Sequence, residues 1–261
     1  MTQNLQVSPL TLALSFSLVL ITFYIAYKEQ LDLWKDLLIA IVRVILQLLI
    51  VGYVLEQVFS IDNALLTVAM VAVIIFNAAW NASKHGKGIN KAFAISLSAI
   101  GIGSLTSLAI LVLSGSLKFT PSQVVPITGM ISGTAMTALG LTYRNLKQLF
   151  EDHRQAFLEM LALGASPQQA STHIKKLAVK SGIQPTIDSV KTTGVVTLPG
   201  MMSGLIFAGV DPTKAIMYQM MISFTLLGTT SLVSATSAHL AIRTFFNDRY
   251  QLTFMPENDK K

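Results

Sequence analysis

Two short segments far apart in the chain share the pattern Gly-Met-X-Ser-Gly, at 129–133 and 200–204. A methionine thioether can bind a soft metal ion, although methionine more often fills an irregular gap in a hydrophobic core. Proline and glycine interruptions in paired membrane segments are typical of the central binding site of a transporter, whereas glycine can also simply allow two helices to pack closely. Both interpretations stay open from the sequence. The candidate pathway residues are Pro126, Gly129, Met130, Ser132, Gly133, Pro199, Gly200, Met201, Met202, Ser203 and Gly204.

The composition predicts that these residues belong to a membrane protein. Hydrophobic residues make up 52% of the 261 residues, and charged residues make up only 12%, about half of the charged fraction usual for a soluble domain. The absence of cysteine excludes disulfide bonds and thiolate ligands. A net charge of +6 can indicate nucleic acid binding, but here the cations gather in particular connections, as membrane topology requires. We therefore expect the lipid bilayer as a partner and no nucleic acid.

Seven apolar segments are near the roughly 20 residues that a helix needs to cross a bilayer. The fifth and sixth contain prolines and glycines, so we expect interrupted helices there. The segments are 9–27, 37–55, 63–82, 92–113, 121–141, 195–210 and 216–240. The predicted fold is an all-α, polytopic membrane protein with about seven transmembrane helices and one transmembrane domain over residues 1–261.

Lysine and arginine residues are distributed unequally between the two predicted sides of the membrane. One side carries sixteen of the nineteen, and the other carries only Lys118 and Lys214. Because basic connections stay in the cytoplasm, we expect a multi-pass protein of the cell inner (plasma) membrane with its N-terminus outside and its C-terminus in the cytoplasm. The last cation, Arg43, lies inside the second segment, where it either contacts a substrate or extends to the cytoplasmic interface.

The polar segment 141–193 predicts a helical loop in the cytoplasm. Apolar residues at helical spacing form the stripe of a first helix, which ends at Gly164. That stripe consists of Leu146, Phe150, Phe157 and Leu161. Ser166 and Gln169 have the spacing of a capping box, so we expect a second helix that begins there and ends at Gly182.

Sequence motifs for an enzyme or an ATPase are absent. The chain contains no G-x-x-x-x-G-K-[ST], no H-E-x-x-H and no G-x-S-x-G. All thirteen acidic residues lie outside the seven apolar segments, so no carboxylate proton relay is evident in the membrane. Uncharged polar residues within the segments either line a polar path or join helices by hydrogen bonds; they include Gln47, Asn77, Asn81 and Gln219. We predict that the chain is not an enzyme and that its energy comes from elsewhere.

Three stretches together resemble the FetB-type family of ABC transporter permeases, which includes a bacterial iron exporter and plant aluminium-tolerance proteins. The stretches are P-I-T-G-M-I-S-G-T-A-M-T-A-L-G-L-T-Y-R-N-L at 126–146, L-A-L-G-A-S-P-Q-Q-A at 161–170 and L-P-G-M-M-S-G at 198–204. The resemblance implies a permease that exports iron or another metal ion and pairs with a separate cytoplasmic ATPase, with two copies of each. It also implies that this chain holds no cofactor, because the partner subunit binds the ATP.

The resemblance further implies that the loop contains a helix that couples the permease to its ATPase. Importer permeases carry E-A-A-x-x-x-G there, and Glu159, Gly164, Ala165, Ser166 and Pro167 look similar. The spacing differs, because Glu159 precedes Gly164 by five residues instead of six, and this leaves the role of Glu159 open. Two other functions stay open from the residues themselves. They are a self-sufficient channel or ion-coupled secondary transporter, and a membrane scaffold that recruits a soluble partner.

Overall fold

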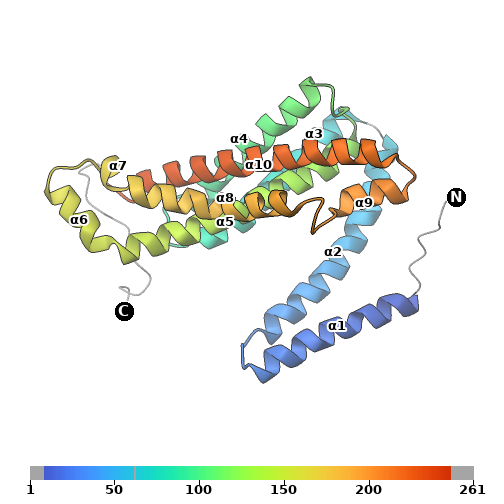
Figure 1. Cartoon of the computed structure of the whole chain (residues 1–261), viewed down its shortest axis with the longest axis horizontal. Coiled ribbons are helices and arrows are strands. Elements are labelled where there is room, and N and C mark those ends of the chain that lie inside the picture. The colour runs from blue at the N-terminus through green and yellow to red at the C-terminus, as the bar shows by residue number, and fades with distance from the viewer. Residues whose placement is uncertain (1–8, 62, 248–261) are drawn as a thin grey trace. The chain divides into compact units, whose positions relative to one another are not determined.

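The computed structural model describes residues 9–61 and 63–247, which form helices joined by turns and contain no β-strand (Figure 1). The described chain divides into two compact units. One contains residues 9–61 with Phe207–Gly209, and the other contains 63–206 and 210–247. The all-α class predicted from the sequence is confirmed.

The first unit contains α1 (Pro9–Lys28) and α2 (Trp34–Ile61), which match the first two predicted spans. Leucine, isoleucine and valine side chains are exposed on all faces of both helices, as expected of helices that face lipid. The turn between them is tight because Gln30 and Asp32 both adopt positive φ angles, of 51° and 49°. Arg43 lies on α2 with an exposed side chain.

The second unit is a bundle of long helices. Buried hydroxyl groups join them in pairs, as is common between helices in a membrane. Ser104 and Ser132 lie 3.2 Å apart between α4 and α5, and Ser107 and Thr229 lie 2.6 Å apart between α4 and α10. The long helices are α3 (Ala64–Ser83), α4 (Ala92–Leu113), α5 (Pro121–Asp152), α8 (Thr172–Thr192) and α10 (Pro212–Arg243).

Six helices in the described residues are long and apolar enough to cross a bilayer, one fewer than the seven predicted. The difference lies in the predicted sixth span over 195–210, where the structure has only α9 (Gly200–Phe207). Eight helical residues extend about 12 Å, well short of the roughly 30 Å hydrocarbon core. The segment 195–210 thus does not form one helix long enough to cross a bilayer, and the interruption expected in this segment lies before Gly200.

The predicted interruption of the fifth span is also wrong. Helix α5 continues through Pro126, Gly129 and Gly133 without a break. Pro126 lies only a few residues after the start of α5, at an exposed position. Each helical glycine costs about 1 kcal/mol, which the packing of a 32-residue helix easily offsets.

The loop after α5 is helical, as predicted, but its helices begin and end elsewhere. The apolar stripe is divided by a bend at His153, between the end of α5 and α6 (Arg154–Ala162). The rings of Phe150 and Phe157 pack edge to face across this bend, with centroids 5.3 Å apart. Gly164 then adopts a φ of +90°, as expected for a glycine that ends a helix.

Helix α8 differs most from the sequence-based expectation. It follows the short helix α7 (Pro167–Ala170) and continues through Gly182 and Pro185 to Thr192. The predicted end at Gly182 is therefore wrong. Helix α8 lies along α5 and α10, in contact with both (Figure 1). The second half of the predicted loop thus packs against two helices that are long and apolar enough to span a membrane.

Candidate functional site

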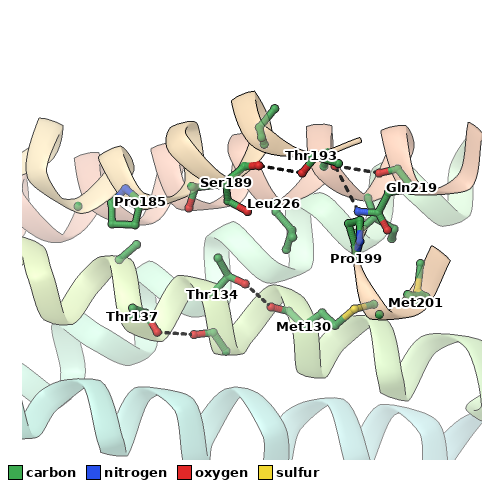
Figure 2. Close-up of a pocket in the computed structure, with 18 of the residues that line it drawn as sticks. Met130, Thr134, Thr137, Pro185, Ser189, Thr193, Pro199, Met201, Gln219 and Leu226 are labelled. Atoms are coloured by element: carbon green, nitrogen blue, oxygen red, sulfur yellow. Dashed lines mark hydrogen bonds between the residues drawn. The ribbon is translucent and has the colours of Figure 1, made fainter. Parts of the chain in front are cut away.

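A cavity of about 440 Å³ lies between α5, α8, α9 and α10 (Figure 2). Each long helix contributes one stripe of residues to its wall. Helix α5 contributes Met130, Gly133, Thr134, Thr137, Ala138 and Leu141. The wall from α8 and the turn after it consists of Gly182, Pro185, Thr186, Ser189, Val190, Thr193 and Pro199, and the remaining lining residues are Gly200, Met201, Gln219, Ile222, Ser223 and Leu226.

Helical periodicity explains why these side chains share one space. On α8, lining residues recur three or four positions apart, so they lie on one face of the helix. That face has only small or uncharged side chains, such as Thr186 and Ser189, whereas Lys180 and Lys191 do not line the cavity. The result is an uncharged polar face that turns inward from an otherwise basic helix.

The wall of α8 can approach its neighbours closely because residue 182 is a glycine. A Cβ atom there would lie 2.6 Å from the Ser234 hydroxyl oxygen, 2.9 Å from the Ala138 carbonyl oxygen and against the Thr142 hydroxyl. Such distances are below those of real side-chain contacts. Gly182 is therefore the residue that admits α8 between α5 and α10.

The helix α8 stops beside the cavity and restarts as α9. Gly194, with a φ of +88°, begins the turn between them. The turn is closed by backbone hydrogen bonds, from the Gly194 amide to the Thr197 carbonyl at 2.8 Å and from the Val196 amide to the Thr192 carbonyl at 2.9 Å. Pro199 then precedes α9 and lines the cavity. Non-helical backbone at membrane depth is tolerated where it lines such a cavity.

The hydroxyl groups of the wall present acceptor oxygens to the cavity. Thr134 donates its hydroxyl hydrogen to the Met130 carbonyl at 2.8 Å, and Thr193 donates to the Ser189 carbonyl at 2.8 Å. Thr137 similarly donates to Gly133, at 3.2 Å. Each hydroxyl has one hydrogen and two lone pairs, so these oxygens can still accept hydrogen bonds or bind a cation.

Gln219 is the polar side chain of the cavity wall that the protein itself leaves unsatisfied. Its residue is only 8% exposed, and its amide nitrogen makes one long hydrogen bond, of 3.4 Å, to the Ser223 hydroxyl. Its carbonyl oxygen is buried and has no partner. Such an atom costs about 1–3 kcal/mol when it stays unsatisfied. A cation or a hydrogen-bond donor that reached this oxygen from the cavity would remove that cost.

The lining set contains no charged residue. Within residues 9–61 and 63–247, no three histidine, cysteine or acidic side chains gather into a group that could hold a metal ion. The donors that the cavity offers are hydroxyl oxygens, the Gln219 carbonyl oxygen and the thioether sulfurs of Met130 and Met201. These atoms can bind a ligand, but they provide no general acid or base.

The structure brings together five of the eleven candidate pathway residues, namely Met130, Gly133, Pro199, Gly200 and Met201. The other six do not line the cavity. Ser132 is buried and lies 3.2 Å from Ser104, and Met202 is buried elsewhere. The remaining four are Pro126, Gly129, Ser203 and Gly204.

Close helix packing does not explain the glycines of the repeat within this chain. A Cβ atom at Gly129, Gly133, Gly200 or Gly204 would meet no other atom within 4 Å. Among the glycines that line the cavity, the one that does permit close packing is Gly182, where the sequence predicts only the end of a helix. Its signal was present in the sequence as small and hydroxyl residues spaced three or four apart along 182–193.

The predicted coupling residues lie at the corner formed by α6 and α7. The capping box is confirmed, because the Ser166 amide donates to the Gln169 side chain at 2.9 Å and the Gln169 amide donates to the Ser166 hydroxyl at 3.3 Å. Glu159 is exposed and accepts a hydrogen bond from Gln155 at 3.0 Å. Apolar side chains are exposed at the same corner; they are Leu158, Met160 and Leu163, the last of them 88% exposed.

Together, the long apolar helices and the uncharged polar cavity beside a helix break define a polytopic α-helical membrane protein. The chain belongs to the uncharacterised protein family UPF0014, whose family model matches residues 9–246.

The chain is similar to several named proteins over nearly its whole length. It is 52% identical to "Probable iron export permease protein FetB" of Escherichia coli K12, over 93% of each chain. It is 30% identical to "Protein ALUMINUM SENSITIVE 3" of Arabidopsis thaliana, over 92% of this chain and 88% of the relative. It is 31% identical to "UPF0014 membrane protein STAR2" of Oryza sativa, over 87% and 80%. No solved structure matches the chain.

Proposed function

We propose that this chain is the membrane-spanning permease subunit of an ATP-driven, ABC-type transporter of the cell inner membrane, and that it exports iron or another metal ion. The observation that carries the proposal is the uncharged polar cavity beside the break between α8 and α9, with the unsatisfied Gln219 oxygen in its wall. The 52% identity to a relative named as an iron export permease supports the choice of cargo.

In this proposal, α8 and α9 together replace the missing sixth span. Helix α8 enters from the cytoplasmic side beside α5 and α10, the chain unwinds over 193–199 at the cavity, and α9 continues to the far side. Transporters commonly build their central sites from such discontinuous helices. This arrangement keeps the two termini on opposite sides of the membrane, as the distribution of basic residues predicts.

The cargo would bind to neutral oxygen and sulfur atoms. The Gln219 carbonyl and the hydroxyls of Thr134 and Thr193 provide oxygen, and Met130 and Met201 provide sulfur. A neutral donor set holds a cation less tightly than carboxylates would. Moderate affinity suits a transport site, because the same site must also release its cargo.

The energy would come from a separate ATPase that docks at the α6–α7 corner. The exposed Leu163 there offers an apolar contact, and the capping box fixes the start of α7. Since α8 follows α7 after a single residue, Ser171, movement of the corner would be transmitted directly to the cavity wall. A second copy of the permease would complete the transporter, as the family resemblance implies.

Reconstitution into proteoliposomes would test this function. The chain and a candidate cytoplasmic ABC ATPase would be purified together, and ATP hydrolysis and metal flux would be measured with each component omitted in turn. We expect flux only when both proteins and ATP are present. Metal flux from the permease alone would overturn the proposal in favour of a self-sufficient channel. An intact complex that moves no metal would show that the cargo is not a metal ion.

A further inference from the structure

A second groove lies between α8 and α10, apart from the cavity described above. Its volume is about 510 Å³, and its lining combines cations with small apolar side chains. The lining residues are Lys175, Lys176, Val179, Lys180, Ile183, Ala235 and His239. It shares no residue with the first cavity.

The lysines lie toward one end of the groove, and Ile183 and Ala235 lie at the other end. Along α8, Lys175 and Lys176 come first and Ile183 last. The two helices run antiparallel (Figure 1), with Gly182 beside Ser234. Ala235 therefore lies near the apolar end, and His239 lies one turn further toward the basic end. The groove thus changes from cationic to apolar along its length.

The basic end coincides with the end of an apolar helix. Between Lys214 and Arg243, α10 contains no lysine, arginine, aspartate or glutamate. Arg243 lies one turn beyond His239, with its side chain exposed. In a spanning helix, such a change from apolar to charged residues marks the depth at which acyl chains meet headgroups.

No acidic side chain lines the groove to balance its cations. Three lysines within six residues of α8 repel one another, so an anion between them would be stabilised. The basic side of a membrane protein faces the cytoplasmic leaflet, where anionic phospholipids gather. Basic pockets between transmembrane helices on this side are suited to phosphate headgroups.

We propose that this groove binds an anionic phospholipid. The phosphate would lie among Lys176, Lys180 and Arg243, and the upper part of an acyl chain would cover Val179 and Ile183. The apolar side chains of Val179 and Ile183 distinguish this ligand from an acidic soluble protein. Such a protein would contact the lysines and leave these apolar side chains uncovered. The bound lipid would hold the start of α8 against α10.

Native mass spectrometry of the full-length protein would test the proposal, with phosphatidylglycerol and phosphatidylcholine added to matched micelles. The variant K176Q/K180Q removes two cations of the groove. The control K84Q/K87Q removes two exposed lysines of the turn after α3, which do not line it. We expect the wild type and the control to retain phosphatidylglycerol in preference to phosphatidylcholine. The groove variant should bind phosphatidylglycerol roughly ten- to thirtyfold more weakly, since each cation near a membrane surface contributes on the order of 1 kcal/mol.

Two further measurements test whether α10 also contributes to lipid binding and whether the groove binds phosphate alone. The variant H239Q/R243Q removes the cation Arg243 and the neighbouring His239 from α10 and leaves the lysines of α8 in place, and it should also weaken phosphatidylglycerol binding. Inorganic phosphate at millimolar concentration should not displace the lipid; if it does, the groove is a phosphate site and the proposal is wrong. Equal retention of the two lipids by the wild type, or an equal loss in K84Q/K87Q, would also overturn it.

Discussion

Gly182 of α8 lies so close to Ser234 of α10 that a Cβ atom at residue 182 would be only 2.6 Å from the Ser234 hydroxyl oxygen. Both residues are buried, and this hydroxyl has no hydrogen-bond partner. The contact holds a basic helix against two apolar ones at one end of the candidate cargo cavity. The absence of a side chain at one residue thus determines where the wall of the cavity lies.

Substitution of this glycine should therefore destabilise the bundle. We expect G182A to lower the free energy of unfolding by about 1–3 kcal/mol, because its methyl group overlaps Thr142 and Ser234. Gly228 of α10 is the matched control, since a Cβ atom there meets nothing within 4 Å. G228A should be neutral or stabilising by up to about 1 kcal/mol, since alanine favours a helix more than glycine does. Thermal unfolding in one detergent would compare the two, and equal effects would show that the close contact is not maintained.

Replacement of Gln219 should impair transport without lowering the stability of the protein. The variant Q219L removes a buried carbonyl oxygen that has no partner, so the melting temperature should not fall. Metal flux should fall roughly tenfold or more, because the loss of one hydrogen bond or cation contact costs on the order of 1–3 kcal/mol. Q148L, at an exposed position of α5 outside the cavity, should leave flux unchanged. Normal flux in Q219L would remove Gln219 from the cargo site.

Contact with the ATPase should depend on the exposed apolar corner between α6 and α7. Leu163 is 88% exposed there, and Leu113 at the end of α4 is 87% exposed, which makes it a matched control. Since neither side chain is packed within the chain, L163S and L113S should both fold with normal melting temperatures. Only L163S should weaken co-purification with the ATPase and the stimulation of its ATP hydrolysis. If L113S has the same effect, the docking surface lies elsewhere.

Membrane topology can be tested directly, because the chain contains no cysteine. The variant S166C places a thiol at the α6–α7 corner, and K118C places one in the connection between α4 and α5. We expect an impermeant maleimide to label K118C in intact cells and S166C only after the membrane is opened. Labelling of S166C from outside would reverse the orientation and contradict a cytoplasmic ATPase as the partner.

Much of the fold could be predicted because its signals are local. Apolar segments of sufficient length correspond to α1 to α5 and α10. The capping box at Ser166 and Gln169 was predicted from spacing alone, since both partners lie within one helical turn. Five of the candidate pathway residues also line the cavity. The prolines and glycines of the repeat mark the point where the helix restarts at α9, but they do not interrupt α5.

Only the tertiary structure determined the position of α8. Its lysines give it the composition of a surface helix, so the sequence predicts a cytoplasmic loop there. The side chains of its inner face are small and uncharged, and this face packs between α5 and α10. There Gly182 contacts Thr142 and Ser234, which lie about 40 and 52 positions away along the chain. The helical spacing of small and hydroxyl residues along 182–193 indicates such a face, but it does not identify the distant residues against which the face packs. For the same reason, the partnerless oxygen of Gln219 became visible only when the neighbours of α10 were in place.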